Sequence, residues 1–265
     1  MKRATDIAMG RSEDFSIDLV KTEDGTFTAR SSSFDECYHS TKDGALNESL
    51  KKHVEPAFAL LPKDKESVTI LDICFGLGYN TLATLFYLKR EKIFKSVKIV
   101  SPEFDEELVK SLPNFPYPDE LHDFKEVIEA VSLYGRYESE LIEVEVVFGD
   151  AREFLSRCEL TFDIVYQDAF SPKKNPLLWT KEYFESLKKR LSKDAIVTTY
   201  SSATPVRMGM YECGLFLYNP PSKGVRSGTI ASPSPFLPLE KIDMELKKLR
   251  NPAAAPLLDK DHQNR

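Results

Sequence analysis

The sequence predicts an α/β fold built on one mostly parallel sheet of seven strands. From residue 67 onward, short apolar runs of strand length alternate with helical runs. Strands of a parallel sheet are buried on both faces, so they read as continuous apolar runs, and helices cover both sides. The expected strands are 68–73, 97–101, 144–148, 162–168, 195–200, 215–219 and, more weakly, 229–232. The expected helices are 80–90, 105–112, 119–134, 151–158, 179–191 and 204–213.

A small appendage precedes the sheet. Apolar and polar residues alternate on both sides of Asp24-Gly25, which predicts a β-hairpin. The next run carries apolar side chains at helical spacing, namely Leu46, Leu50, Val54 and Phe58. We therefore divide the chain into a hairpin and helix appendage (1–60), a core (61–232) and a C-terminal tail (233–265). The tail is expected to carry one short helix and to end in disorder.

The composition is that of a globular protein: 42% of the 265 residues are hydrophobic and 29% are charged. The first ten residues lack the apolar stretch of a signal peptide, and no run of 18 apolar residues predicts a membrane span. The four cysteines and four histidines are scattered, so the sequence supports neither a disulfide framework nor a metal site. We expect a cytoplasmic protein without a bound metal.

The charge is distributed unevenly, although the net value is −6. Residues 1–170 carry 20 Lys and Arg against 33 Asp and Glu, whereas residues 171–265 carry 16 against 9. Such asymmetry suggests an anionic partner for the basic part. Basic surface helices that serve only solubility are the alternative.

The stretch VTILDICFGLGYNTL (68–82) predicts a strand, a glycine-containing loop and the start of a helix, an arrangement that is typical of nucleotide-like ligand binding. The dinucleotide pattern needs a third glycine where Thr81 stands, and no Gly-Lys-Ser/Thr follows for a P-loop. S-adenosylmethionine has no pyrophosphate, so it needs only the close backbone approach that Gly76 and Gly78 permit. This loop therefore favours S-adenosylmethionine as the ligand.

Three acidic residues follow successive strands in the positions that this ligand requires. Asp72 ends the first strand, where a carboxylate holds the methionine ammonium directly or through water. Glu103 follows the second strand and is expected to accept the ribose hydroxyls, and Asp150 follows the third, near the adenine. Each alone is also a common helix cap. Their joint occurrence with the glycines supports a binding site.

The fourth strand predicts where the chemistry occurs, because active sites of parallel sheets lie beyond the carboxyl ends of the strands. Asp168 ends this strand, and the Pro-rich loop AFSPKKNP follows. If the acceptor is an amine, the site must bind it, take a proton and align nitrogen with the methyl group. A carboxylate does the first two, so Asp168 is the candidate catalytic residue. A structural cap for the loop is the alternative.

Four segments in this order resemble one family: FDECYHSTKDGALNES, DICFGLGYNTL, YQDAFSPKKNPLLWT and TTYSSATPVRMGMYECGLFLY. They are similar to the methyltransferase domain of the bifunctional MnmC proteins over about residues 30–232. The resemblance implies a class I (Rossmann-like) methyltransferase fold and S-adenosylmethionine as donor. It also implies methylation of the amine of 5-aminomethyl(-2-thio)uridine at the wobble position of tRNA, giving 5-methylaminomethyluridine. The tRNA anticodon region would be the partner, with no stable protein partner and no membrane.

The resemblance also carries over site residues. It implies that the donor is bound by Tyr38, Ser40, Glu48, Asp72, Cys74, Gly76, Gly78, Asn80, Glu103, Asp150, Ala151 and Asp168. Gly44 belongs to the segment that closes over the donor, and Pro172 and Pro176 continue the Asp168 motif. Cys74 departs from the family, which commonly has glycine there. The chain also has no GxGxxG and no length for the family's FAD-dependent oxidase domain. A stand-alone methyltransferase without FAD is therefore expected.

The substrate side draws on the basic part of the chain. The residues expected to contact the modified nucleotide or tRNA are Phe170, Lys173, Lys174, Asn175, Trp179, Arg207, Lys223 and Arg226. Trp179 could stack on an unpaired base, as aromatic side chains do in RNA binding, but burial in the core is the role that we favour for it.

Two other functions remain open from the sequence. An aminopropyltransferase of the spermidine-synthase type shares such a donor site and a Tyr38-His39 pair, but Lys173 and Lys174 disfavour the acidic pocket that a diamine needs. A non-catalytic RNA-binding module on a methyltransferase fold is disfavoured because the acidic residues are all retained.

Overall fold

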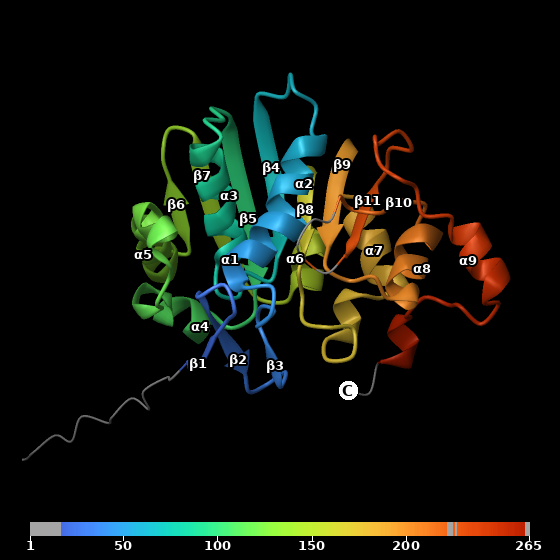
Figure 1. Cartoon of the computed structure of the whole chain (residues 1–265), viewed down its shortest axis with the longest axis horizontal. Helices are drawn as coiled ribbons and strands as arrows, with labels where there is room; N and C mark the ends of the chain where they lie inside the picture. Colours follow the sequence, from blue (N-terminus) through green and yellow to red (C-terminus); the bar gives the residue numbers. More distant parts are fainter. Residues whose placement is uncertain (1–16, 222–224, 226, 263–265) are drawn as a thin grey trace, which may run out of the picture.

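The eight strands of the main sheet are joined in the order β10-β11-β9-β8-β4-β5-β7-β6 (Figure 1). This computed structural model describes residues 17–221, 225 and 227–262, and the count of strands refers to these residues. In chain order the strands are β4 (Ser67–Ile73), β5 (Ser96–Glu103), β6 (Arg136–Glu138), β7 (Ile142–Phe148), β8 (Phe162–Gln167), β9 (Leu191–Thr199), β10 (Phe216–Tyr218) and β11 (Thr229–Ser232).

The sheet is mostly parallel, as the sequence predicts. Strands β9, β8, β4, β5 and β7 pair in parallel, while β6 at one edge and β11 and β10 at the other are antiparallel. The expected number of seven strands is wrong, because β6 was missed. This strand has only three residues and begins directly after Gly135, so it shows no apolar run of its own.

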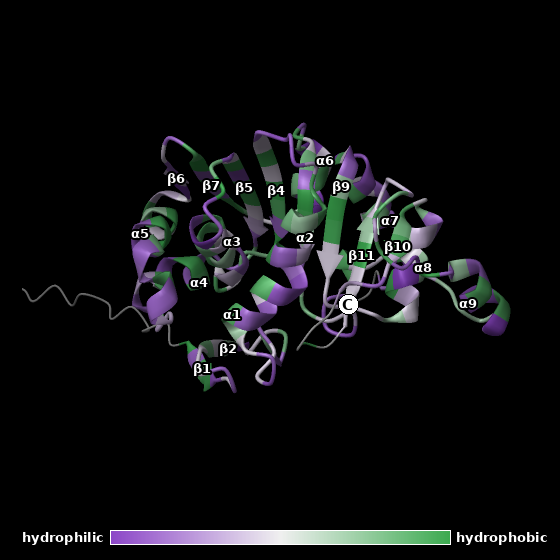
Figure 2. Cartoon of the chain, turned by 45° about the horizontal axis from the view of Figure 1, so that its top comes forward, coloured by the Kyte–Doolittle hydropathy of each residue, from purple (hydrophilic) through white to green (hydrophobic). Residues whose placement is uncertain are grey.

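Both faces of the sheet are buried, which explains the continuous apolar runs. Alternate residues of one strand enter two different hydrophobic clusters, as Ile70 and Leu71 of β4 do. In Figure 2 hydrophobic residues occupy the middle of β9. One face is covered by α3 (Tyr79–Arg90), α4 (Glu106–Ser111) and α5 (Lys125–Tyr134). The other face is covered by α6 (Ala151–Arg157), α7 (Lys181–Lys188) and α8 (Thr204–Glu212).

The N-terminal hairpin is present and belongs to a three-stranded antiparallel sheet. Strand β1 (Asp18–Lys21) pairs with β2 (Phe27–Ser31), which pairs with the short strand β3 (Glu36–Cys37). Strand β3 was not expected, since two residues give no periodic signal. The expected division into three segments stays a prediction.

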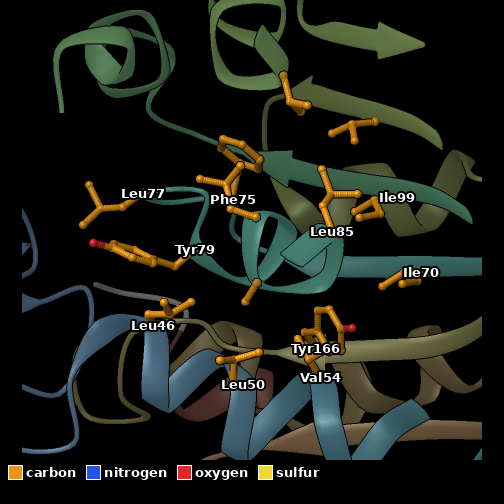
Figure 3. Packing of buried hydrophobic residues seen from close by; sticks show 14 of the residues in the cluster. Leu46, Leu50, Val54, Ile70, Phe75, Leu77, Tyr79, Leu85, Ile99 and Tyr166 are labelled. Carbon is orange, nitrogen blue, oxygen red and sulfur yellow. The ribbon is translucent and has the colours of Figure 1, made fainter. Parts of the chain in front are cut away.

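The helix after this sheet is continuous but changes its winding. It runs through α1 (Ala45–Glu48), a π-helical segment (Ser49–Val54) and α2 (Glu55–Leu60). Its Leu46, Leu50 and Val54 face the same buried cluster as α3, as Figure 3 shows. Packing against the main sheet thus fixes this helix beside the ends of the central strands. Wide π-helical turns occur often at functional sites.

The C-terminal segment folds back along the molecule. It contains α9 (Met244–Arg250), and Leu257 then forms a bridge with Thr180, while Asp259 is paired with Arg152. Residues 263–265, expected to be disordered, lie outside the described residues. Short 3₁₀ turns complete the fold at Leu112–Asn114, Asp119–Phe124, Pro176–Leu178 and Asp259–Asp261. Within the described ranges, no helix has the length and apolar character needed to cross a membrane.

Candidate active site

A cleft of about 1360 Å³ lies at the carboxyl ends of the central strands. Its lining includes residues that directly follow β4, β7, β8 and β9, as the sequence predicts for a parallel sheet. The predicted site residues in the lining are Tyr38, Ser40, Glu48, Cys74, Gly76, Asn80, Glu103, Asp150, Ala151, Asp168, Phe170 and Asn175. The chain therefore brings together residues that are up to 137 positions apart in sequence, from Tyr38 to Asn175.

The loop after β4 is drawn tightly against the appendage. Gly76 has a φ of +53°, and a Cβ there would lie 3.1 Å from the Tyr38 ring. Gly78 has a φ of +73° and begins α3. Cys74 also lies in the left-handed region, with a φ of +67°. This explains why a glycine suits position 74: an L-residue with a Cβ is strained in that conformation. The thiol is accommodated, and burial raises its pKa well above the usual value.

The Glu103 carboxylate is fixed at the edge of the cleft by backbone donors. The Gly76 N–H donates to Oε2 at 2.8 Å and the Asp105 N–H donates to Oε1 at 2.8 Å. Burial raises the pKa of Glu103, and these backbone hydrogen bonds oppose that effect. The carboxylate is thus held in one orientation and keeps free lone pairs for further donors.

Asp72 lies behind the cleft, not in its lining. Its carboxylate is fully buried and accepts hydrogen bonds from Thr81 Oγ1 at 3.1 Å and from Asn80 Nδ2 at 3.2 Å. Burial raises the pKa of Asp72 well above its ordinary value, and the nearby Asp168 charge adds to this. Asp72 therefore reaches the cleft only through Asn80.

Asn80 connects the two aspartates. Its Nδ2 also donates to Asp168 Oδ2 at 2.9 Å. Its Oδ1 is buried and has no hydrogen-bond partner among the described residues. An acceptor left unpaired beside the cleft is suited to a ligand that brings an N–H group.

Asp150 has the capping role that the sequence left open. Its Oδ1 accepts from the Arg152 N–H at 2.7 Å at the start of α6. The side chain is exposed and also lines the cleft, so one carboxylate caps the helix and faces the ligand space.

Asp168 lies at the floor of the cleft, with 9% of its side chain exposed. Its Oδ1 is 3.4 Å from Nε2 of His53. Burial raises the pKa of Asp168, but the neighbouring His53 and His39 and the hydrogen bond from Asn80 oppose this effect, so the net pKa is below its ordinary value. Asp168 is therefore an ionised carboxylate.

His53 is not among the site residues predicted from the sequence. It lies three residues after Leu50 and seven after Leu46, on the apolar side of the predicted helix. This position was the available signal, because a histidine on the apolar side of a helix is expected to be buried. His122, in contrast, is exposed.

A second charged group was also missed. Lys52 Nζ donates to Glu48 Oε1 at 2.6 Å and to Asp43 Oδ2 at 2.7 Å. Glu48 Oε2 accepts from the Ser40 N–H at 2.6 Å. This network connects the loop before α1 to the helix that carries His53. Both carboxylate oxygens of Glu48 thus accept hydrogen bonds from groups of the protein itself.

Aromatic side chains form one wall of the cleft. Phe170 stacks on Phe34 with ring centroids 4.5 Å apart and packs against Tyr38 at 4.9 Å. Trp179, in contrast, is fully buried, and its Nε1–H donates to the Phe170 carbonyl at 2.7 Å. Trp179 thus has the buried role that we favour from the sequence over stacking on a base: it supports the loop from inside the core.

The basic residues do not gather at the cleft as expected. Arg207 is only 8% exposed, and its guanidinium donates to Thr229 Oγ1 at 2.8 Å and to the Gly228 carbonyl at 3.0 Å. This burial corrects its expected role as a phosphate contact. Lys174 is exposed but paired with Asp35 at 3.2 Å, and Lys173 is exposed. Lys223 and Arg226 lie outside the described residues.

The charge of the cleft is negative. Lys52 and Arg152 are the only Lys or Arg side chains in the described lining. The acidic residues of the lining are Glu36, Asp43, Glu48, Glu103, Asp105, Glu106, Glu107, Asp150 and Asp168. Such a cleft favours cationic ligands and repels phosphate groups. No group of three or more His, Cys, Asp and Glu in the described part of the chain is arranged to hold a metal ion.

Known proteins match this chain along most of its length. A family model described as S-adenosyl-L-methionine-dependent methyltransferase matches residues 122–234. An uncharacterized protein of Methanocaldococcus jannaschii is 30% identical over 228 residues, which are 82% of this chain and 60% of that protein. The tRNA 5-methylaminomethyl-2-thiouridine biosynthesis bifunctional protein MnmC of Azoarcus sp. is 30% identical over 218 residues, 78% of this chain and 34% of that protein. The chain thus spans less than two thirds of these relatives.

The crystal structure of MnmC2 from Aquifex aeolicus superimposes with a TM-score of 0.81 and 31% sequence identity. The match covers 96% of this chain and 82% of that one. These likenesses favour a methyltransferase over an aminopropyltransferase or a non-catalytic RNA-binding module.

Proposed function

Because the chain belongs to the MnmC-type family of S-adenosylmethionine-dependent methyltransferases, we propose that it methylates the primary amine of 5-aminomethyl(-2-thio)uridine at the wobble position of tRNA. The product would be the 5-methylaminomethyl nucleoside. The observation that carries this proposal is the ionised Asp168 at the floor of an acidic cleft, beside the donor loop. A buried carboxylate in this place is suited to an ammonium group.

The cleft fits the methyl donor. When bound, S-adenosylmethionine supplies an electrophilic methyl group on a positively charged sulfur. The unpaired Asn80 Oδ1 is suited to accept from an ammonium, and the fixed Glu103 carboxylate is suited to accept from two hydroxyl groups. The close approach at Gly76 leaves room where a Cβ would contact Tyr38. The negative lining favours a cationic ligand in general.

Asp168 has two tasks in this proposal. It attracts the ammonium form of the acceptor, and it takes the proton that must leave before nitrogen has a free lone pair. An alkyl ammonium has a pKa near 10, by analogy with lysine, so little free amine reaches the site from neutral solution. Positioning of the two reactants is expected to supply much of the rate, roughly 7–11 kcal/mol at best.

The aromatic wall supports a nucleobase as the carrier of the amine. Phe34 and Phe170 present apolar ring surface to the cleft beside Asp168, and bases removed from a helix stack on such rings. Asn175 also lines the cleft and offers an amide for the base edge.

The tRNA backbone would lie outside the acidic cleft. We propose that the anticodon region inserts one nucleotide while phosphates contact basic residues outside the cleft, with the exposed Lys173 as the described candidate. Lys223 and Arg226, which lie outside the described residues, stay candidates from the sequence alone. Counter-ions released from phosphates then give binding its salt dependence.

The direct test is transfer of tritiated methyl from S-adenosylmethionine to tRNA that bears 5-aminomethyl-2-thiouridine. Nucleoside analysis should find label in 5-methylaminomethyl-2-thiouridine only. The same tRNA without the aminomethyl group is the matched control, and putrescine tests aminopropyl transfer. Label in the unmodified tRNA, or in no tRNA, would contradict the proposed acceptor.

A further inference from the structure

The buried imidazole of His53 lies beside the Asp168 carboxylate. Its side chain is 0% exposed and lies in the π-helical segment. Nδ1 is 2.9 Å from Thr198 Oγ1, on β9. Nε2 is 3.4 Å from Asp168 Oδ1, yet it has no hydrogen-bond partner among the described residues. A buried ring nitrogen is thus aimed at the catalytic carboxylate without being satisfied by it.

The contacts of Thr198 permit a tautomer of His53 in which Nδ1 carries the proton. The Thr198 hydroxyl can donate to the Val165 carbonyl at 3.4 Å and accept from an Nδ1–H of His53 at 2.9 Å. In this tautomer the second nitrogen carries a lone pair. Nε2 and Oδ1 of Asp168 then face each other across 3.4 Å, each with a lone pair. This arrangement becomes favourable when one proton arrives between them.

The chemistry needs such a second acceptor. A carboxylate is a far weaker base than an alkyl amine, so Asp168 holds the proton only weakly. The proton from the acceptor ammonium would return to nitrogen before methyl transfer unless a stronger base kept it. An imidazole is such a base at neutral pH.

We propose that His53 is the positioning residue of the methyl transfer, and that its Nε2 keeps the proton which the acceptor ammonium loses through Asp168. This role rests on the proposed amine methylation. In this role the π-helical segment carries the His53 ring, and the ring is held in place by this segment and by Thr198 of β9.

The step balances as follows. One N–H bond of the acceptor ammonium breaks, and its proton passes to Asp168 Oδ1 and then to His53 Nε2. The electron pair left on nitrogen forms the new N–C bond to the methyl carbon. The C–S bond breaks and its pair stays on sulfur. The products are a secondary ammonium, a neutral thioether and an imidazolium paired with the Asp168 carboxylate, which releases its proton to solvent when the product leaves.

The other ionisable groups near His53 do not replace it. Burial lowers the pKa of His39, which faces the site from the loop before α1, so this ring is neutral. Burial raises the pKa of Tyr166, whose ring centroid lies 5.7 Å from that of His53, so this phenol stays protonated at neutral pH. Asp72 lies outside the cleft lining, and Asn80 hydrogen-bonds it on one side and Asp168 on the other. Glu48 and Lys52 are paired with each other. Asp168 is therefore the charge that His53 meets.

The test compares His53→Gln and His53→Asn with wild type in single-turnover methylation of aminomethyluridine tRNA across pH 6–10. We expect the rate at pH 7 to fall by roughly 10²-fold, the lower range for general acid–base groups. We also expect the rate of the variants to rise about tenfold per pH unit, because free amine must then come from solvent. The wild-type profile should be flatter. Donor affinity by calorimetry should be unchanged.

Ser49→Ala is the matched control, because Ser49 is equally buried on the same π-helical segment and its hydroxyl has no partner among the described residues. This variant should keep the wild-type rate and pH profile. Folded His53 variants with the wild-type profile would overturn the role of His53. Wild-type protein that transfers no methyl group to this tRNA would overturn the proposed function, and the source of the proton with it.

A second readout needs no turnover. In protein with ¹³C-labelled histidine, the Cε1 signal absent from His53→Gln identifies His53. In Asp168→Asn protein, the chemical shift of this signal at neutral pH should differ from that in wild type, because the carboxylate beside the ring is gone. The same signal in Ser49→Ala should follow wild type. Identical behaviour in wild type and Asp168→Asn would show that the two groups do not share a proton, whether or not the variants are active.

Discussion

The backbone N–H of Gly76 donates to the Glu103 carboxylate across 2.8 Å, so the ends of β4 and β5 are joined at the mouth of the cleft. The two residues are 27 positions apart in sequence. The glycine thus has two effects: it admits the Tyr38 ring above the loop, and it orients the carboxylate that we assign to the ribose.

Replacement of Glu103 tests this assignment. Glu103→Gln keeps the shape but removes the charge, so hydrogen bonds to the donor's hydroxyls become neutral ones. Calorimetric titration should show donor binding weakened by about 1.5–3 kcal/mol, the usual contribution of a hydrogen bond to a charged group. Glu91→Gln, at an exposed position beyond α3, is the control. Unchanged affinity in Glu103→Gln would remove the ribose contact from the site.

Asp168→Asn should affect the chemical step far more than donor binding, because asparagine keeps the shape of the side chain and one acceptor oxygen. The amide neither attracts the ammonium nor takes its proton, so kcat should fall by roughly 10²–10⁴. The rate should also climb more steeply with pH than in wild type. Donor affinity and Tm should change little, which must be measured beside the kinetics. Normal methylation by a folded variant would leave Asp168 with a structural role only.

Asp72 should make the protein less stable as the pH rises. Its folded-state pKa is raised by burial above the unfolded value of about 3.9. The folded state therefore binds more protons between these two values, and the free energy of unfolding falls with increasing pH over that window. Denaturant titrations of wild type and Asp72→Asn at several pH values isolate this effect. If the difference between the two proteins is independent of pH, Asp72 does not contribute in this way.

Trp179→Phe should reduce stability and spare RNA binding. The change leaves the Phe170 carbonyl without its Nε1–H donor and opens a small cavity in the core. We expect the free energy of unfolding to fall by about 1–3 kcal/mol. The Kd for tRNA should stay the same. A large loss of tRNA affinity in the folded variant would restore a direct role in base contact.

Replacement of Lys173 should affect tRNA binding, whereas replacement of Arg207 should affect stability. Lys173→Ala should weaken tRNA binding and reduce the slope of log Kd against log salt by about 0.7–0.9, as expected for one lost phosphate contact. Arg207→Ala should instead lower Tm, because it removes two buried hydrogen bonds. Filter binding over a salt series and thermal melting make the comparison. Equal salt slopes for wild type and Lys173→Ala would move the phosphate contacts elsewhere.

Local patterns in the sequence were enough to predict the central strands and the position of the cleft. Continuous apolar runs predicted β4, β5, β7, β8 and β9, because a strand buried on both faces has few polar positions. Two glycines and the acids at strand ends predicted the cleft, since parallel strands end at one edge. Each of these signals lies within a few residues and follows from backbone geometry.

Tertiary packing alone decided which side chains reach that edge. His53 meets Asp168 across 115 positions because Leu50 and Val54 pack the helix onto the sheet. Arg207 looks like a surface contact in the sequence, but Gly228 and Thr229 supply acceptors that keep its guanidinium inside. Asp72 is likewise kept out of the cleft lining, where its hydrogen-bond partner Asn80 lies instead. Such outcomes depend on hydrogen bonds and packing between distant segments, which a run of residues does not encode locally.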